Sequence, residues 1–325
     1  MDYSATLRRG WQIVWKNKWL ILLSLIPALG GLGFLLVSFA GAGFPTDPST
    51  MTPDMLSRLG TRTLLLSCVS VLFSLVIGII GLAARGGMIV GVAGVERGEA
   101  YGFGRAFRAG WRKVLSLVGM TILVYGVVLA LYFAMIAVLV LSLVIGAAGA
   151  GAASGDGEGL LAGMGLLVIL AICCLGGLVF LAALVASFVY PFAYRGIMLR
   201  EMGVVASIRH GWRVLRENLG QILLLALPFF VIMLIAVGAY LAVYYAISFP
   251  TIMAQMNDAL TGTPPTTAGM GTLSPLFLVL YVVYVLVISV IATWQSATFT
   301  LGYLQWTGKD VLTDPYPPAP SAPLM

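Results

Sequence analysis

The stretch VVLALYFAMIAVLVLSLV, residues 127–144, consists almost entirely of apolar residues. It lacks the alternation of apolar and polar positions that the strands of a transmembrane barrel show. An α-helix crosses a bilayer with about 20 residues, and 18 or more apolar residues in a row are typical of such a helix. The stretch therefore predicts a membrane-spanning helix.

The composition of the chain extends this prediction to the whole protein. Of its 325 residues, 60% are hydrophobic and 9% are charged, whereas a soluble domain has about 25% charged residues. A soluble fold could not cover its surface with so few charges. We predict an all-α, polytopic membrane helix bundle with six transmembrane helices, at roughly 19–41, 64–84, 116–146, 160–190, 221–248 and 275–305.

A short signature recurs ahead of the odd-numbered spans. It reads Thr6-Leu7-Arg8-Arg9-Gly10-Trp11, Ala106-Phe107-Arg108-Ala109-Gly110-Trp111 and Ser207-Ile208-Arg209-His210-Gly211-Trp212. Repeats at a fixed period indicate one structural unit that is used several times. We predict three repeats, about 4–95, 103–200 and 204–308, within a single membrane domain over residues 1–308. Each repeat consists of an interfacial amphipathic helix and two spans.

Apolar residues around each Gly-Trp recur at helical offsets of four, four and three, as in Tyr3, Leu7, Trp11 and Val14. Basic residues occupy much of the remaining helix surface. A basic helix with an aromatic face suits the cytoplasmic headgroup region, where each basic residue near anionic lipid contributes about 1 kcal/mol. Two interpretations stay open: the helices bind or organise lipid, or they only orient the spans.

The distribution of charge predicts the orientation in the membrane. Of the 18 Lys and Arg residues, only Arg58 and Arg62 fall on one side of the predicted spans. This asymmetry favours a cell (inner) membrane protein with both termini in the cytoplasm. The net charge of +6 then reflects topology, and we expect no nucleic-acid partner. The first apolar run is longer than the 7–15 residues of a signal peptide, so we expect it to be retained.

The outward segments 42–62, 147–159 and 249–274 are rich in Pro, Gly, Ala, Ser or Thr, and we predict flexible loops there. Residues 309–325 are proline-rich and predict a disordered tail. The three cysteines lie in predicted spans and are interpreted as small apolar fillers. With one His in the chain and no catalytic signature, we expect no enzyme activity, cofactor or metal site.

Two arginines occupy matching places in the first two repeats, within Ala84-Arg85-Gly86 and Tyr194-Arg195-Gly196. They predict either an anion or headgroup site at the inner mouth of the bundle or a pair of positive-inside anchors. Together with the signature, they complete the set of candidate lipid or anion contacts: Arg85, Arg195, Trp11, Trp111, Trp212, Arg8, Arg108 and Arg209.

Two further patterns concern helix packing. The inner half of the sixth span is polar, with Thr293, Thr298 and Thr300 among its residues. These hydroxyls predict either interhelical hydrogen bonds or a substrate path. The small residues Ala83, Gly87 and Gly91 recur every four positions in the second span, which favours close approach of another helix.

The signature also carries a family resemblance, through Gly10-Trp11 with Trp15 and Asn17, Gly110-Trp111, and Gly211-Trp212 with Asn218. From about residue 4 to residue 308 the chain resembles poorly characterised bacterial six-span proteins. These include the membrane domain ahead of the catalytic domain in some glycerophosphoryl diester phosphodiesterases. The catalytic barrel of those enzymes has no counterpart in these residues, so we expect no phosphodiesterase activity.

The function expected from these patterns is that of a non-enzymatic integral membrane protein. It would organise membrane lipid, through anionic headgroups, or bind a protein partner of unknown identity at the cytoplasmic leaflet. The alternative is a permease for a small or lipidic solute, which the polar sixth span and the two arginines favour.

Overall fold

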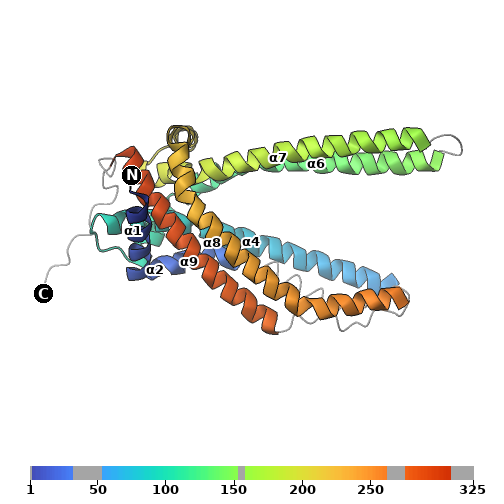
Figure 1. Cartoon of the computed structure of the whole chain (residues 1–325), viewed down its shortest axis with the longest axis horizontal. Helices are drawn as coiled ribbons and strands as arrows, with labels where there is room; N and C mark the ends of the chain where they lie inside the picture. The colour runs from blue at the N-terminus through green and yellow to red at the C-terminus, as the bar shows by residue number, and fades with distance from the viewer. Residues whose placement is uncertain (1, 32–52, 153–157, 262–274, 309–325) are drawn as a thin grey trace. The chain divides into compact units, whose positions relative to one another are not determined.

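The computed structural model describes residues 2–31, 53–152, 158–261 and 275–308. All regular elements in these ranges are helical and none is a strand (Figure 1), so the predicted all-α class is confirmed. The elements are α1 (Tyr3–Lys16), α2 (Trp19–Ala28) with the 3-10 turn η1 (Leu29–Gly31), α4 (Pro53–Glu96), α5 (Phe103–Arg112), α6 (Val114–Ala152), α7 (Glu158–Arg200), α8 (Val204–Thr261) and α9 (Pro275–Thr307).

Five helical segments are long and apolar enough to cross a membrane: Gly60–Glu96, Val114–Ser142, Cys173–Arg200, Val204–Pro250 and Leu278–Thr307. They indicate a multi-pass membrane protein. The first predicted span, 19–41, is helical through α2 and η1 as far as Gly31. The remainder of that span and the predicted tail, 309–325, lie outside the described residues.

The chain divides into two compact units. The first unit contains the residues up to 114 and those from 218 onward, and the second contains residues 115–217. The second boundary falls inside α8, where Asn218 leaves the helical conformation with φ −123° and ψ 22°. This break separates the third copy of the signature from the apolar span that follows it.

In the first unit, α2 packs against α4 and α9. Two glycines of α4 allow the close approach of α2. A Cβ atom added at Gly81 would lie 2.9 Å from the Cβ of Pro27, and one added at Gly91 would lie 2.5 Å from Cη2 of Trp19. The predicted close packing at Gly91 is therefore confirmed.

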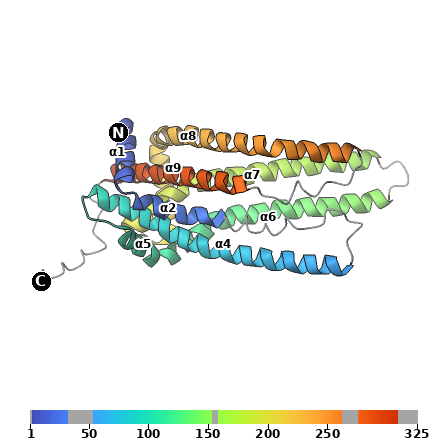
Figure 2. The same ribbon diagram turned by 90° about the horizontal axis from the view of Figure 1, so that it is seen from below.

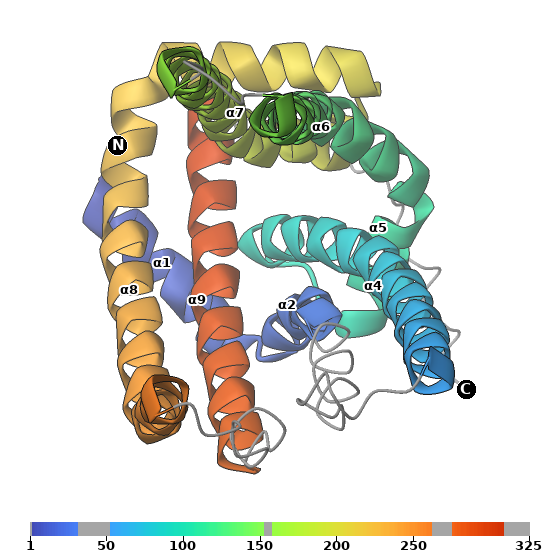
Figure 3. The same ribbon diagram turned by 90° about the vertical axis from the view of Figure 1, so that its right-hand side faces the viewer.

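Helices α8 and α9 also lie side by side in this unit (Figures 2 and 3). The rings of Tyr240 and Tyr284 have their centroids 4.3 Å apart, and those of Phe229 and Trp294 are 4.8 Å apart. Aromatic pairs at such distances contribute beyond the area that they bury. They hold the two helices together along much of their length.

In the second unit, α6 and α7 run antiparallel next to each other (Figure 1). The hydroxyl oxygens of Thr121 and Tyr190 are 3.2 Å apart. A Cβ atom added at Gly176 would lie 3.9 Å from the sulfur of Met135. Thr121 and Met135 are separated by the same number of residues as Tyr190 and Gly176, so the pairing keeps one register.

Parts of the predicted outward loops are helical instead. Helix α4 begins at Pro53, α6 continues to Ala152 and α8 continues to Thr261. Proline suits the first turn of a helix because its missing N–H needs no partner there. The Met-Ala-Gln-Met run from Met253 consists of strong helix formers, which explains the extension of α8.

In each unit the buried residues gather at one end of the long helices. The buried apolar residues of α4 lie between Ala83 and Ala93, and those of α7 lie between Ala186 and Leu199. The remaining turns of these helices expose Leu, Val and Phe side chains, as expected for a surface that contacts lipid. The packed ends are those next to the three copies of the signature.

Candidate functional site

The three copies of the signature lie on α1, on α5 and on the first part of α8, residues 204–217. In each copy the small residue and the glycine four positions later are buried. The tryptophan that follows the glycine is exposed, to 38% for Trp11, 47% for Trp111 and 49% for Trp212. The buried pairs are Thr6 with Gly10, Ala106 with Gly110 and Ser207 with Gly211.

Helix α1 packs against α9 through Gly10. A Cβ atom added at this glycine would lie 2.5 Å from Oγ1 of Thr298 and 3.3 Å from its Cα. The contact is reinforced by Trp294, whose indole Nε1 donates a hydrogen bond of 3.0 Å to the carbonyl oxygen of Leu7. Helix α1 is thus attached to α9.

Helix α5 packs against α4 through glycines on both helices. A Cβ atom added at Gly110 would collide with the carbonyl oxygen of Ala83 and would lie 2.6 Å from the nitrogen of Gly87. One added at Gly87 would lie 2.5 Å from the carbonyl oxygen of Ala106. The predicted small-residue contact at Ala83 and Gly87 is therefore confirmed, and α5 is the helix that uses it.

The first part of α8 packs against α7 in the same way. A Cβ atom added at Gly211 would lie 2.7 Å from the nitrogen of Ala193 and 3.1 Å from the carbonyl oxygen of Val189. Gly196 faces Ser207, with 3.3 Å between an added Cβ and the Cβ of the serine. All three glycines of the signature therefore allow backbone-to-helix contact that any side chain would block.

A second surface of the three helices carries aromatic rings, of which those of Trp11, Trp111 and Trp212 are exposed. On α5 the rings of Phe103, Phe107 and Trp111 stack in a row, with centroid distances of 6.1 and 6.0 Å. On α1 the rings of Trp11 and Trp15 stack at 5.4 Å. Aromatic rings next to basic residues favour the membrane interface.

A third surface is basic. In every copy the arginine two positions before the glycine is exposed. At about 100° per residue, the tryptophan lies about 100° around the helix from the glycine, and the arginine lies about 160° from it. Packing, aromatic and basic surfaces thus follow one another around each helix. The exposed arginines are Arg8, Arg108 and Arg209.

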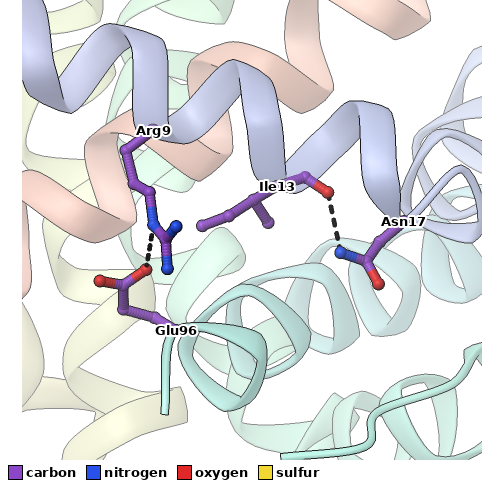
Figure 4. Close-up of polar contacts among 4 residues, drawn as sticks. All are labelled: Arg9, Ile13, Asn17 and Glu96. Carbon is purple, nitrogen blue, oxygen red and sulfur yellow. Dashed lines mark hydrogen bonds and ion pairs between the residues drawn. The ribbon is translucent and has the colours of Figure 1, made fainter. Parts of the chain in front are cut away.

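Polar contacts fix the ends and the position of α1. Asp2 accepts a hydrogen bond from the backbone nitrogen of Ala5, which caps the helix and lowers the pKa of the carboxyl group. The Nε atom of Arg9 lies 3.1 Å from Oε2 of Glu96 at the end of α4 (Figure 4). At the other end, the side-chain amide of Asn17 donates to the carbonyl oxygen of Ile13.

The two candidate arginines lie in different surroundings. Arg85, in the first unit, is exposed. Arg195, in the second unit, is only 3% exposed, and its Nη1 donates a hydrogen bond of 2.7 Å to the carbonyl oxygen of Pro191. Equivalent places in the sequence therefore do not give equivalent side-chain environments.

The polar residues of α9 are largely satisfied within their own helix. The hydroxyl of Thr293 donates to the carbonyl oxygen of Ser289, and that of Thr300 donates to Ser296, both at 2.7 Å. Within the described part of the chain, the buried hydroxyls of Ser289 and Thr298 have no hydrogen-bond partner. Hydrogen bonds within α9 therefore satisfy some of its polar side chains but not these two hydroxyls.

Among the described residues, no group of three or more His, Cys, Asp and Glu side chains could hold a metal ion. The thiols of Cys68, Cys173 and Cys174 are free and exposed. They lie on helices that are long enough to cross a membrane. Interpretation of the cysteines as buried fillers is therefore wrong for these three side chains.

Sequence reasoning missed the packing role of the signature. It assigned the Gly-Trp pair to the membrane interface, whereas the glycine and the small residue before it contact the neighbouring helix. The spacing of a small residue and a glycine at i and i+4 is typical of close helix contacts, so the information was present in the sequence. Its partners, Thr298, Ala83 and Val189, required the tertiary structure.

The long apolar helices and their buried small-residue contacts define a multi-pass helical membrane protein. Residues 1–306 match one family model, and the chain belongs to this family, described as a domain of unknown function (DUF7847). No curated protein matches the chain. No solved structure matches it either.

Proposed function

We propose that the protein is a six-span, three-repeat protein of the cell membrane that organises anionic lipid at the cytoplasmic leaflet without enzymatic chemistry. In this arrangement α1, α5 and the first part of α8 lie in the headgroup plane as amphipathic helices. Both termini are cytoplasmic. We also propose that the protein is related to the membrane domain of glycerophosphoryl diester phosphodiesterases.

One observation carries this proposal: in all three copies the glycine packs against a long helix while the tryptophan and arginine of the same copy stay exposed. Exposed cations also orient spans, so the lipid role is favoured by the tryptophan that each copy exposes beside its arginine. Arginine next to an interfacial ring can reach lipid phosphates. Negative headgroups are therefore the partner that this surface fits.

The test is the lipid preference of the reconstituted full-length protein. Spin-labelled phosphatidylglycerol and phosphatidylcholine report the relative association of each lipid with the protein surface. Replacing Arg8, Arg108 and Arg209 by Gln should lower the preference for phosphatidylglycerol about fivefold at each site, because each cation contributes about 1 kcal/mol. The matched control is Arg62→Gln, at the predicted outer face, which should leave the preference unchanged.

If the triple variant keeps the full preference, the helices only orient the spans. A permease for a small or lipidic solute is the second candidate, favoured by the unpartnered hydroxyls of Ser289 and Thr298 on α9. Solute flux into vesicles that is abolished by Arg85→Ala and Arg195→Ala would favour the permease over lipid organisation.

A further inference from the structure

Helix α5 carries far more aromatic surface than the third copy of the signature. Its three rings stack in order along the helix, with interplanar angles of 2° between Phe103 and Phe107 and of 25° between Phe107 and Trp111. Phe103 is 40% exposed and Trp111 is 47% exposed. Residues 204–217 contain a single Phe, Tyr or Trp residue, which is Trp212.

The basic side of α5 is weaker than that of the third copy. Arg105 is engaged within the protein, because its Cζ atom lies 4.5 Å from the centroid of the Tyr101 ring and its Nη2 atom lies 4.0 Å from Oε2 of Glu99. Helix α5 exposes Arg108 and Arg112. Residues 204–217 expose three arginines, which are Arg209, Arg213 and Arg216.

The two helices should therefore contact lipid in different ways. Burial of a large ring contributes more than a cation at the membrane surface. Helix α5 combines three rings with two exposed cations, so apolar insertion dominates its contact. Residues 204–217 combine one ring with three exposed cations, so attraction to anionic headgroups dominates there.

The rings lie between the packing side of α5 and its basic side. At about 100° per residue, the three rings lie between about 20° and 100° around the helix from Gly110, and Arg108 lies about 160° from it. Gly110 packs sideways on α4, which is long enough to cross a membrane. In the headgroup plane, where the proposed function places α5, the row of rings faces the acyl chains, because the apolar face of an interfacial helix is the buried one.

We propose that the aromatic row of α5 recognises a convexly curved cytoplasmic leaflet, in which gaps between the headgroups expose acyl chains. Membrane contact through buried apolar area depends on curvature, since a row of stacked rings needs room between the lipids. Attraction by charge does not need such gaps. The inference rests on the proposed function for the position of α5, and it adds the kind of membrane that this helix selects.

The test measures the density of the full-length protein on thin tethers pulled from giant vesicles of phosphatidylcholine and phosphatidylglycerol. A membrane-impermeant dye is attached from outside through Ala100→Cys, in a chain whose three native cysteines are replaced by alanine. Ala100 is exposed just before α5, so the dye marks only molecules whose α5 lies on the convex outer leaflet. We expect these molecules to be enriched on the tether over the vesicle.

A double variant, Phe103→Ser with Trp111→Ser, should lose this enrichment. Both rings are exposed, so their removal leaves the packing of α5 on α4 intact. The matched control is Trp212→Ser, which removes an equally exposed tryptophan from the third copy and should keep the enrichment.

Equal density of the unaltered protein on tether and vesicle would overturn the proposal. Enrichment that persists in the double variant would overturn it as well, since the long helices would then cause it. Loss of enrichment in Trp212→Ser would show that α5 has no special part in it. The spin-label measurement with the three arginine variants tests the proposed function separately, so failure of one can be told from failure of the other.

Discussion

Gly110 illustrates at the scale of one residue how α5 is held on α4. Its missing side chain allows the α5 backbone to reach the carbonyl oxygen of Ala83 and the nitrogen of Gly87. Gly104 lies on the same helix and has nothing within 4 Å of an added Cβ atom. The two glycines differ in space alone, which makes them a matched pair.

We expect Gly110→Ala to destabilise the protein by about 1–3 kcal/mol, because the added methyl group forces the two helices apart. Gly104→Ala should instead be neutral or stabilising by up to about 1 kcal/mol, through its higher helix propensity. Unfolding midpoints in detergent measure both effects. Equal loss of stability in the two variants would contradict the assignment of Gly110 as a packing contact.

We expect an exposed ion pair to contribute far less to stability than the packing contact of Gly110. The ion pair between Arg9 and Glu96 is exposed, with 51% and 29% of the two side chains accessible. Solvent screening reduces such a pair to about 0.5 kcal/mol or less. Arg9→Gln should therefore leave the unfolding midpoint nearly unchanged, and a shift as large as that of Gly110→Ala would show a role that the geometry does not explain.

At the scale of the element, each helix that carries the signature separates its contacts around its circumference. The small residue and glycine contact a long helix, the tryptophan lies on an exposed aromatic surface, and the arginine lies beyond it. On α5 the aromatic surface is a continuous row of three rings. On α5, changes on one surface should therefore leave the others intact.

A peptide of residues 101–114 contains α5 and tests how each of its surfaces contributes to membrane binding. Trp111→Ser should weaken its binding to anionic vesicles about tenfold, since burial of a large apolar side chain contributes about 1.5–3 kcal/mol. Ala106→Ser alters only the packing surface and should leave binding unchanged. Tryptophan fluorescence reports binding of the Ala106→Ser peptide, and circular dichroism reports it for both. Unchanged binding of Trp111→Ser would remove the support for the lipid interface.

At the scale of the whole molecule, the three glycine contacts follow one rule. Helix α5 packs on α4 and the first part of α8 packs on α7, in each case the long helix that precedes it in the chain. Helix α1 packs on α9, the last of the described helices. The same contact thus occurs once per predicted repeat, which supports the proposed three-repeat arrangement.

Cysteine labelling tests the proposed orientation, in a chain whose three native cysteines are replaced by alanine. A membrane-impermeant thiol reagent added from outside should label Ser154→Cys, in the predicted outward loop. Gly104→Cys, on exposed α5, should react only after the membrane is permeabilised. Labelling of Gly104→Cys in intact cells would reverse the topology.

Sequence patterns predicted the helical class, five of the long apolar helices and the close contacts at Ala83, Gly87 and Gly91, because hydropathy and small-residue spacing are local properties. The extent of α4, α6 and α8 was underestimated, since proline is tolerated in the first turn of a helix, where Pro53 stands, and strong helix formers follow Met253 in α8. The candidate residues were also predicted, but not their environments.

The sequence by itself determined the membrane class of the protein and the three copies of the signature, since both depend on the order of apolar, basic and small residues along the chain. Tertiary structure alone decided which helix receives each glycine, why Arg85 is exposed while Arg195 is buried, and where the hydroxyl of Ser24 on α2 meets a carbonyl oxygen of α9. The physical reason is that these contacts join residues up to 288 positions apart, such as Gly10 and Thr298. Local patterns carry no information about such pairs.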